Sequence, residues 1–155
     1  MSIINKLDPE LIFIHEGTTE RVELFQKVNR VLRSKGIVTE GYLDAVIARE
    51  NDHPTAMQLV SMGVAIPHVD TEFVHEERLV VVTSPDGFVF KSAEDDDETL
   101  TVNVVFFLLL KNKDAHLQFL MKLIGLFQQT EKMEQLLSTE STAEVIALLS
   151  ANLEA

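Results

Sequence analysis

The sequence predicts a single domain of the α/β class, in which helices pack against a β-sheet. Short apolar runs rich in β-branched residues, typical of strands, alternate with segments whose apolar residues recur every three or four positions, typical of helices. The chain has 155 residues, of which 46% are hydrophobic and 25% charged, and this suits one globular domain with a substantial core. Neither an internal repeat nor a linker rich in Gly, Ser and Pro divides the sequence. We therefore expect residues 1–155 to form one domain.

The first part of the chain predicts one strand followed by two helices. The apolar run 11–14 is the strand. A helix then begins after Thr18 or Thr19, either of which can cap it, and ends at Gly36. A second helix begins at Thr39. The residues expected to face the core in these two helices are Val22, Phe25, Val28, Leu32, Leu43, Val46 and Ile47.

Three further strands are predicted in the second half of the chain. Residues 79–83 are apolar and mostly β-branched, typical of a buried strand, and 88–90 form a shorter strand after a turn at 85–87. The run 102–110 is almost continuously apolar, which is typical of a central strand covered on both faces. The acidic run 94–98 lacks the glycine and the ligand spacing of a calcium-binding loop, so we expect a solvated turn there.

Two helices are predicted after the last strand. Asp114 is placed to cap the first of them. Ser141 and Glu144 have the spacing of a capping box, which predicts the start of the second. The residues expected to face the core are Leu117, Leu120, Met121, Ile124 and Phe127 in the first helix, and Val145, Leu148 and Leu149 in the second.

The charge and composition argue against several classes of function. The net charge of −12 argues against binding to nucleic acids or anionic membranes, because phosphate groups are bound by clustered Lys and Arg. The chain has no cysteine, which excludes thiol chemistry and suits a cytosolic protein. Residues 1–6 lack a secretory signal pattern, and the longest apolar run, 104–110, is too short to span a bilayer. We expect a soluble cytosolic protein that reaches a membrane only through a partner.

One histidine directly follows a proline at the end of the short apolar run 63–66. Pro67 fixes its own φ and restricts the residue before it, so His68 is well placed to be held rigidly. Imidazole is largely neutral near pH 7 and can therefore act as a nucleophile without a separate base. From this spacing alone, His68 is either a nucleophile or the histidine of a turn.

Two other segments extend this signal. The segment 49–55 contains an arginine–glutamate pair and leads to a proline–threonine pair, and a His-Leu-Gln sequence occupies 116–118, after the long apolar strand. Together with the Val-Ala-Ile-Pro-His run at 64–68, they resemble the fructose/mannitol-type enzyme IIA domain of the bacterial phosphoenolpyruvate-dependent sugar phosphotransferase system. The likeness is strongest to its galactitol-like branch. Val69 stands where that family most often has a small residue.

The resemblance implies a mixed β-sheet between two layers of helices, with a phosphoryl acceptor at His68. It implies that His116 stabilises the phosphoryl group from the start of a helix and that Arg49 contacts phosphate oxygens. A surface histidine that caps the helix and a solvated arginine at a helix end are the alternatives. Thr55 either offers its hydroxyl to the phosphate or begins a turn. Asp70 either fixes the tautomer of the imidazole or forms a turn.

The function implied by the resemblance is that of an enzyme IIA component, a phosphotransferase with a phosphohistidine intermediate. Such a component accepts a phosphoryl group from the histidine-containing phosphocarrier protein and passes it to a IIB protein or domain during uptake of a sugar or sugar alcohol. The first expectation for the transported compound is galactitol or a similar sugar alcohol. The alternatives are a regulatory IIA-like protein or a non-catalytic interaction domain. No metal or other cofactor is expected, since tight zinc spacing is lacking. Val69, Phe73 and Val74 either form an apolar rim for docking or pack in the core.

Overall fold

A mixed sheet of five strands forms the centre of the protein in the computed structural model, which describes residues 7–18 and 20–153. The strand order is β1-β4-β5-β3-β2. β1 runs parallel to β4 and β3 parallel to β5, whereas the β4–β5 and β2–β3 pairs are antiparallel. The strands are β1 (Ile12–Phe13), β2 (Met57–Gln58), β3 (Gly63–Ala65), β4 (Arg78–Lys91) and β5 (Thr99–Leu109).

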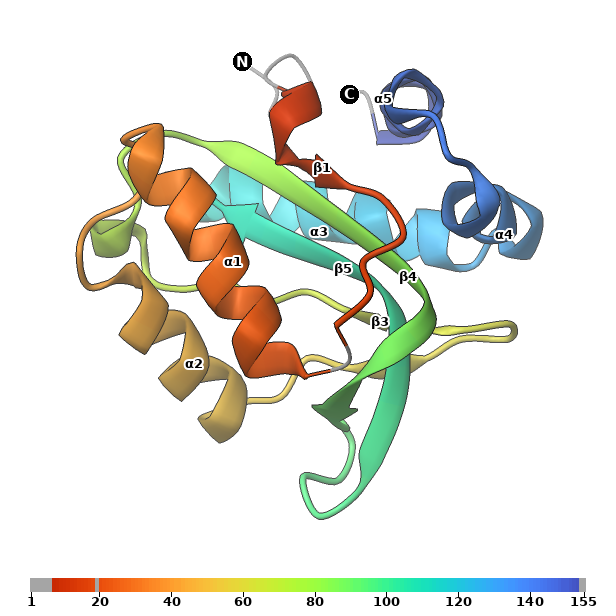
Figure 1. Cartoon of the computed structure of the whole chain (residues 1–155), viewed down its shortest axis with the longest axis horizontal. Coiled ribbons are helices and arrows are strands. Elements are labelled where there is room, and N and C mark those ends of the chain that lie inside the picture. The colour runs from red at the N-terminus through yellow and green to blue at the C-terminus, as the bar shows by residue number, and fades with distance from the viewer. Residues whose placement is uncertain (1–6, 19, 154–155) are drawn as a thin grey trace.

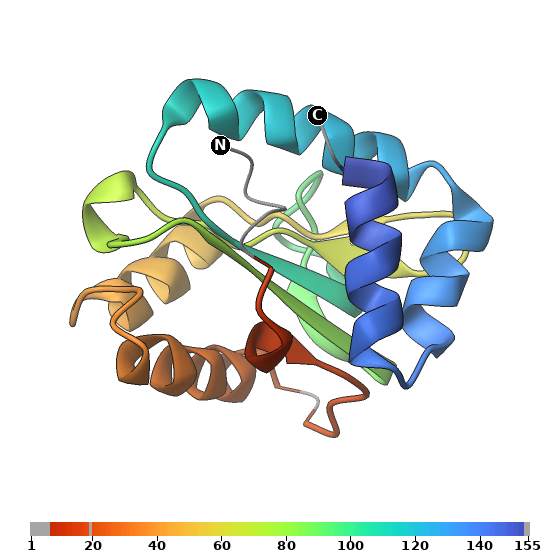
Figure 2. The same ribbon diagram turned by 90° about the horizontal axis from the view of Figure 1, so that it is seen from above.

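Helices cover both faces of this sheet, so the predicted three-layer α/β architecture is confirmed (Figures 1 and 2). Two helices lie on one face, α1 (Arg21–Ser34) and α2 (Tyr42–Asp52). Three lie on the other, α3 (Lys113–Phe127), α4 (Thr130–Ser138) and α5 (Thr142–Leu153). Short 3-10 helices occur at Pro9–Leu11 and Thr71–Phe73. In the described part of the chain, no helix combines the length and the apolar character needed to cross a membrane.

The alternation of side chains along β4 and β5 supplies a core to both layers. Val80 and Phe107 are directly opposite each other and pack toward α1 and α2. Their neighbours Val81 and Phe106 are also paired, and pack toward α3, α4 and α5. All four are fully buried. The continuously apolar sequence of these strands therefore reflects burial on both faces, as predicted.

The predicted strands 79–83 and 88–90 are parts of one long strand, β4, and the prediction of two separate strands was wrong. The pairing with β5 continues through this region, with a shift of register between Thr83 and Phe88. Gly87 has a positive φ of 83°, a conformation that glycine adopts readily. The Pro-Asp-Gly sequence thus forms an irregularity within a strand and does not reverse the chain.

The buried face of α3 differs from the prediction. Leu117 is 61% exposed, Met121 is 66% exposed, and Ile124 is also exposed. The face that packs on the sheet carries instead Phe119 and Leu123, both buried. Because this helix is apolar on more than one side, its 3.6-residue period did not identify the buried stripe. Further differences are that Val22 of α1 is exposed, that α4 was not predicted, and that the first strand is limited to Ile12–Phe13.

Several predicted helix boundaries and turns are confirmed. Gly36, which follows α1, has a φ of 70°, as expected of a residue just after a helix C-terminus. Ser141 Oγ accepts the backbone N–H of Glu144 at 3.2 Å at the start of α5. The acidic run 94–98 is an exposed connection between β4 and β5. Of the two threonines proposed as caps of α1, Thr18 donates to Glu23, and Thr19 lies outside the described residues.

We expect the substitution Gly63→Ala to destabilise the protein. A Cβ atom at Gly63 would lie 2.1 Å from the backbone oxygen of Thr101 in β5, so the two strands would have to separate. Overpacking of this kind lowers the free energy of unfolding by about 1–3 kcal/mol, measurable by chemical denaturation. Gly125→Ala in α3 is the matched control, because its added Cβ would have no described atom within 4 Å apart from its chain neighbours and the backbone of its own helix. An unchanged stability of Gly63→Ala would contradict this prediction.

Candidate functional site

His68 lies where the parallel strands β3 and β5 end. The chain continues from β3 through Pro67, whose carbonyl oxygen accepts the N–H of Leu108 at 3.0 Å. His68 itself pairs with Leu108 as a single parallel bridge. The histidine is therefore fixed at the carboxyl ends of two parallel strands, where open α/β sheets bind their ligands.

A backbone carbonyl sets the tautomer of His68. The Nδ1 atom of His68 lies 2.9 Å from the carbonyl oxygen of Ile66. Since a carbonyl oxygen can only accept, Nδ1 carries the proton and donates this hydrogen bond. In the neutral ring, Nε2 then carries the lone pair and is the nucleophilic atom. Fixing this tautomer was one of the two alternatives for Asp70, but in the structure the partner of Nδ1 is the Ile66 carbonyl.

The surroundings of His68 favour the neutral ring. Burial lowers the pKa of His68, and the positive charge of Arg49 lowers it further. The hydrogen bond to Ile66 and the negative charge of Asp70 act in the opposite direction, but the net pKa lies below the usual value. The imidazole is consequently uncharged at neutral pH, which is the nucleophilic form.

Arg49 and Asp70 lie beside this histidine and form an ion pair. Arg49 is in the last turn of α2, which ends at Asp52. Its Nη1 atom lies 3.7 Å from Asp70 Oδ1, and both side chains are partly exposed. The Nε atom of Arg49 is buried and has no hydrogen-bond partner among the described residues. The guanidinium group thus retains donor capacity near the imidazole.

Thr55 makes three hydrogen bonds, none of them foreseen from the sequence. Its backbone N–H donates to Glu50 Oε2 at 2.8 Å, and its hydroxyl donates to Glu50 Oε1 at 2.9 Å. The hydroxyl oxygen in turn accepts the backbone N–H of Ile66 at 3.0 Å. The hydroxyl proton is therefore directed at Glu50, a residue that the sequence analysis did not single out for a role. The only indication of this contact in the sequence was the presence of an arginine–glutamate pair and a proline–threonine pair in segment 49–55.

The predicted second histidine belongs to α3, a helix on the opposite face of the sheet from α2 (Figure 2). His116 is in the first turn of α3, which begins shortly after β5, but its side chain lies outside the described residues. Its role therefore stays a prediction. The proposed apolar rim packs toward the core: Val74 is buried, and Val69 and Phe73 pack against the α1–α2 side of the core.

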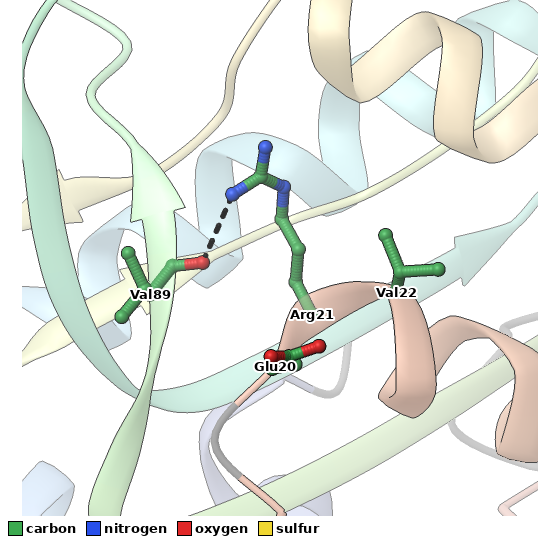
Figure 3. A pocket seen from close by; sticks show the side chains of 4 residues that line it. All are labelled: Glu20, Arg21, Val22 and Val89. Carbon is green, nitrogen blue, oxygen red and sulfur yellow. Dashed lines mark hydrogen bonds between the residues drawn. The ribbon is translucent and has the colours of Figure 1, made fainter.

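A separate hollow of about 410 Å³ lies between the start of α1 and β4 (Figure 3). The described residues that line it are Glu20, Arg21, Val22 and Val89. Arg21 Nη1 donates to the carbonyl oxygen of Val89 at 3.1 Å. None of the predicted site residues is among the described residues that line this hollow. Burial raises the pKa of Glu50, and the positive charge of Arg21 opposes part of that rise.

We expect the titration of His68, followed by ¹⁵N NMR, to have its midpoint below the usual histidine value of about 6.5. Between the two values the unfolded chain binds more protons, so acidification through this range lowers the free energy of unfolding. Asp70→Asn should lower the midpoint further, whereas Arg49→Gln should raise it. A midpoint at or above the usual value, or shifts of opposite sign, would contradict this electrostatic description.

Comparison with known proteins assigns the chain to a family. Residues 5–152 match the family model described as phosphoenolpyruvate-dependent sugar phosphotransferase system, EIIA 2. The chain belongs to this family, as the sequence resemblance indicated. The galactitol-specific EIIA component of Escherichia coli K12 is 27% identical over 84% of this chain and 88% of its own length.

Two solved structures show the same fold and belong to different functional settings. The nitrogen regulatory protein IIA-Ntr from Neisseria meningitidis has a TM-score of 0.77 and 26% identity, over 95% of this chain and 98% of its own. Enzyme IIAMTL from Escherichia coli, in complex with phosphorylated enzyme IIBMTL, has a TM-score of 0.74 and 25% identity, over 92% of this chain and 95% of its own.

Proposed function

We propose that residues 1–155 act as one IIA domain, which accepts a phosphoryl group on His68 from the histidine-containing phosphocarrier protein and passes it to a IIB protein or domain. The observation that carries this proposal is the hydrogen bond from Nδ1 to the Ile66 carbonyl, because it makes Nε2 the nucleophile. Family membership and the fold support the same reading.

In the accepting step, the lone pair of His68 Nε2 forms a bond to phosphorus while the bond from phosphorus to the donor nitrogen breaks. The electron pair of the broken bond returns to the donor ring. The proton on Nδ1 stays in place, so positive charge develops on the His68 ring, where the Ile66 carbonyl oxygen stabilises it. The phosphoramidate that results stays reactive, and the same bond changes in reverse carry the group to the acceptor.

Compensation of the phosphoryl charge falls to Arg49 and His116 in this proposal. The guanidinium of Arg49 lies beside the site in a 3.7 Å contact with Asp70, and its Nε has no partner among the described residues. A planar donor of this kind suits the equatorial oxygens of a phosphoryl group in transfer. His116, in the first turn of α3, acts from a helix N-terminus, where backbone N–H groups add positive potential.

The acceptor is inferred from the relatives. The structural neighbour IIAMTL was solved with phosphorylated IIBMTL, and one relative, from Escherichia coli K12, is a galactitol-specific EIIA component. We therefore propose a IIB acceptor and, as the physiological setting, uptake of galactitol or a similar sugar alcohol, in the cytoplasm. The phosphocarrier protein as donor is the corresponding proposal for the preceding step.

The test is a stepwise phosphorylation followed by intact-mass spectrometry. The protein is mixed with phosphoenolpyruvate, enzyme I and the phosphocarrier protein, and a purified galactitol-type IIB is then added. One acid-labile phosphoryl group that passes to IIB is the expected result. No added mass, with the phosphocarrier itself shown to be charged, would overturn the proposal and make this a non-catalytic interaction domain.

A regulatory function is the second candidate, and the likeness to IIA-Ntr supports it. A protein of this kind takes the same phosphoryl group but signals to a partner by its phosphorylation state. The same experiment separates the two functions. Phosphorylation of His68 without transfer to any IIB of the galactitol or mannitol type would favour regulation.

A further inference from the structure

We propose that Glu50 is a positioning residue for His68, which acts through Thr55 and the backbone of Ile66. This inference rests on the function proposed above for His68. Glu50 lies in the last turn of α2 and is 3% exposed. A buried carboxylate is costly unless its oxygens are hydrogen-bonded, so its partners show what this residue stabilises.

Both partners of the Glu50 carboxylate belong to Thr55. Oε2 accepts the backbone N–H at 2.8 Å, and Oε1 accepts the hydroxyl at 2.9 Å. An ionised carboxylate can only accept, and the threonine hydroxyl has a single proton. The hydroxyl must therefore direct its proton to Glu50 and present its lone pairs elsewhere. They receive the N–H of Ile66 at 3.0 Å.

Ile66 is thus held from both of its backbone polar groups. Its N–H is bound by Thr55 Oγ1, and its carbonyl oxygen accepts the Nδ1 proton of His68 at 2.9 Å. Only Pro67, with its fixed φ, separates the two residues. A displacement of Ile66 would consequently change both the place of the imidazole and the strength of the bond that sets its tautomer.

The charges around Glu50 are compatible with this role. Burial raises the pKa of Glu50 above its usual value, and the two hydrogen bonds from Thr55 and the positive charge of Arg21 offset only part of this rise. Arg21 lies at the hollow between α1 and β4, where it donates to Val89 (Figure 3). The carboxylate therefore has a source of positive potential that is separate from the phosphoryl site.

The test replaces the threonine and measures both the imidazole and the reaction. Thr55→Val keeps the side-chain shape but removes the hydroxyl. We expect the maximal rate of phosphoryl acceptance to fall about tenfold, with the KM for the phosphocarrier protein little changed. The ¹⁵N shifts of the His68 ring should move from a pure Nδ1–H tautomer toward a mixture. Thr55→Ser, which retains the hydroxyl group, should keep both the maximal rate and the His68 tautomer at the wild-type values.

Two further variants complete the design. Thr99→Val is the control, because Thr99 is an exposed residue at the start of β5, and it should leave rate and tautomer unchanged. Glu50→Gln serves if Thr55→Val does not fold. It keeps the shape of the side chain but replaces one of the two acceptor oxygens with an NH2 group, so it cannot accept both hydrogen bonds from Thr55. The rate should then fall about threefold, with a smaller change of tautomer.

The outcomes distinguish this inference from the proposed function. If Thr55→Val and Glu50→Gln fold and leave both rate and ring shifts at the wild-type values, the positioning role is wrong while phosphoryl transfer stands. If wild type accepts no phosphoryl group but the ring shifts still respond to both substitutions, the positioning role stands and the phosphocarrier function is wrong.

Discussion

The variant His68→Ala is expected to accept no phosphoryl group from the charged phosphocarrier protein. Alanine has no nucleophilic atom, and transfer to this domain requires a nitrogen that can form the phosphoramidate. Intact-mass spectrometry under conditions that preserve acid-labile groups measures the effect directly. His68 is only partly buried, and its Nδ1 hydrogen bond is to the Ile66 carbonyl. The fold should therefore survive, with a loss of about 1 kcal/mol in unfolding free energy.

The matched control for this experiment is His75→Ala. His75 is an exposed histidine soon after the 3-10 helix Thr71–Phe73, near His68 in the sequence but without a proposed role. This variant should take up one phosphoryl group at the wild-type rate. If His68→Ala still acquired an acid-labile group, or if His75→Ala lost it, the assignment of the acceptor would be wrong.

The variant Arg49→Ala is expected to accept the phosphoryl group about a hundredfold more slowly, the usual loss when one oriented donor to the transition state is removed. The acceptor imidazole remains, so the final extent of phosphorylation should be unchanged. Arg49→Lys keeps the charge but not the planar, multiply donating group, and should recover only part of the rate. Stopped-time mass spectrometry at several phosphocarrier concentrations separates the maximal rate from KM.

Arg33→Ala provides the comparison for a general loss of positive charge. Arg33 is an exposed arginine in the last turn of α1 and should give the wild-type rate. Equal rates for Arg49→Ala and wild type would make Arg49 a solvated arginine at a helix end, the alternative left open by the sequence. A fall confined to the extent of phosphorylation would also contradict its proposed role.

The layered architecture could be predicted from the sequence because the apolar side chains of β4 and β5 need to be buried on both faces of a sheet. The continuous apolar run 102–110 predicted a central strand covered on both faces, and the family resemblance implied that the cover is helical, with a mixed sheet between two layers. The buried side of α3 could not be predicted in the same way, since Leu117 and Met121 are as apolar as Phe119 and Leu123. Which pair faces the sheet depends on the path of the chain after β5.

The candidate site was predictable where its chemistry lies in a side chain and not where it depends on tertiary contacts. The proline–histidine pair and Arg49 could be singled out from the sequence, and the structure brings His68, Arg49 and Asp70 together. The role of Glu50 could not be predicted from the sequence, because it follows from the hydrogen bonds of the buried carboxylate to Thr55.

The orientation of the His68 ring is encoded in the path of the main chain. The group that holds Nδ1 is the carbonyl of Ile66, and no point mutation can remove a backbone oxygen. A substitution of Ile66 changes its side chain but keeps the carbonyl oxygen that fixes the tautomer of His68. Selection on the orientation of the imidazole therefore acts less on residue 66 than on the residues that hold its backbone in place, and these can accept or reject substitutions far from the phosphoryl group.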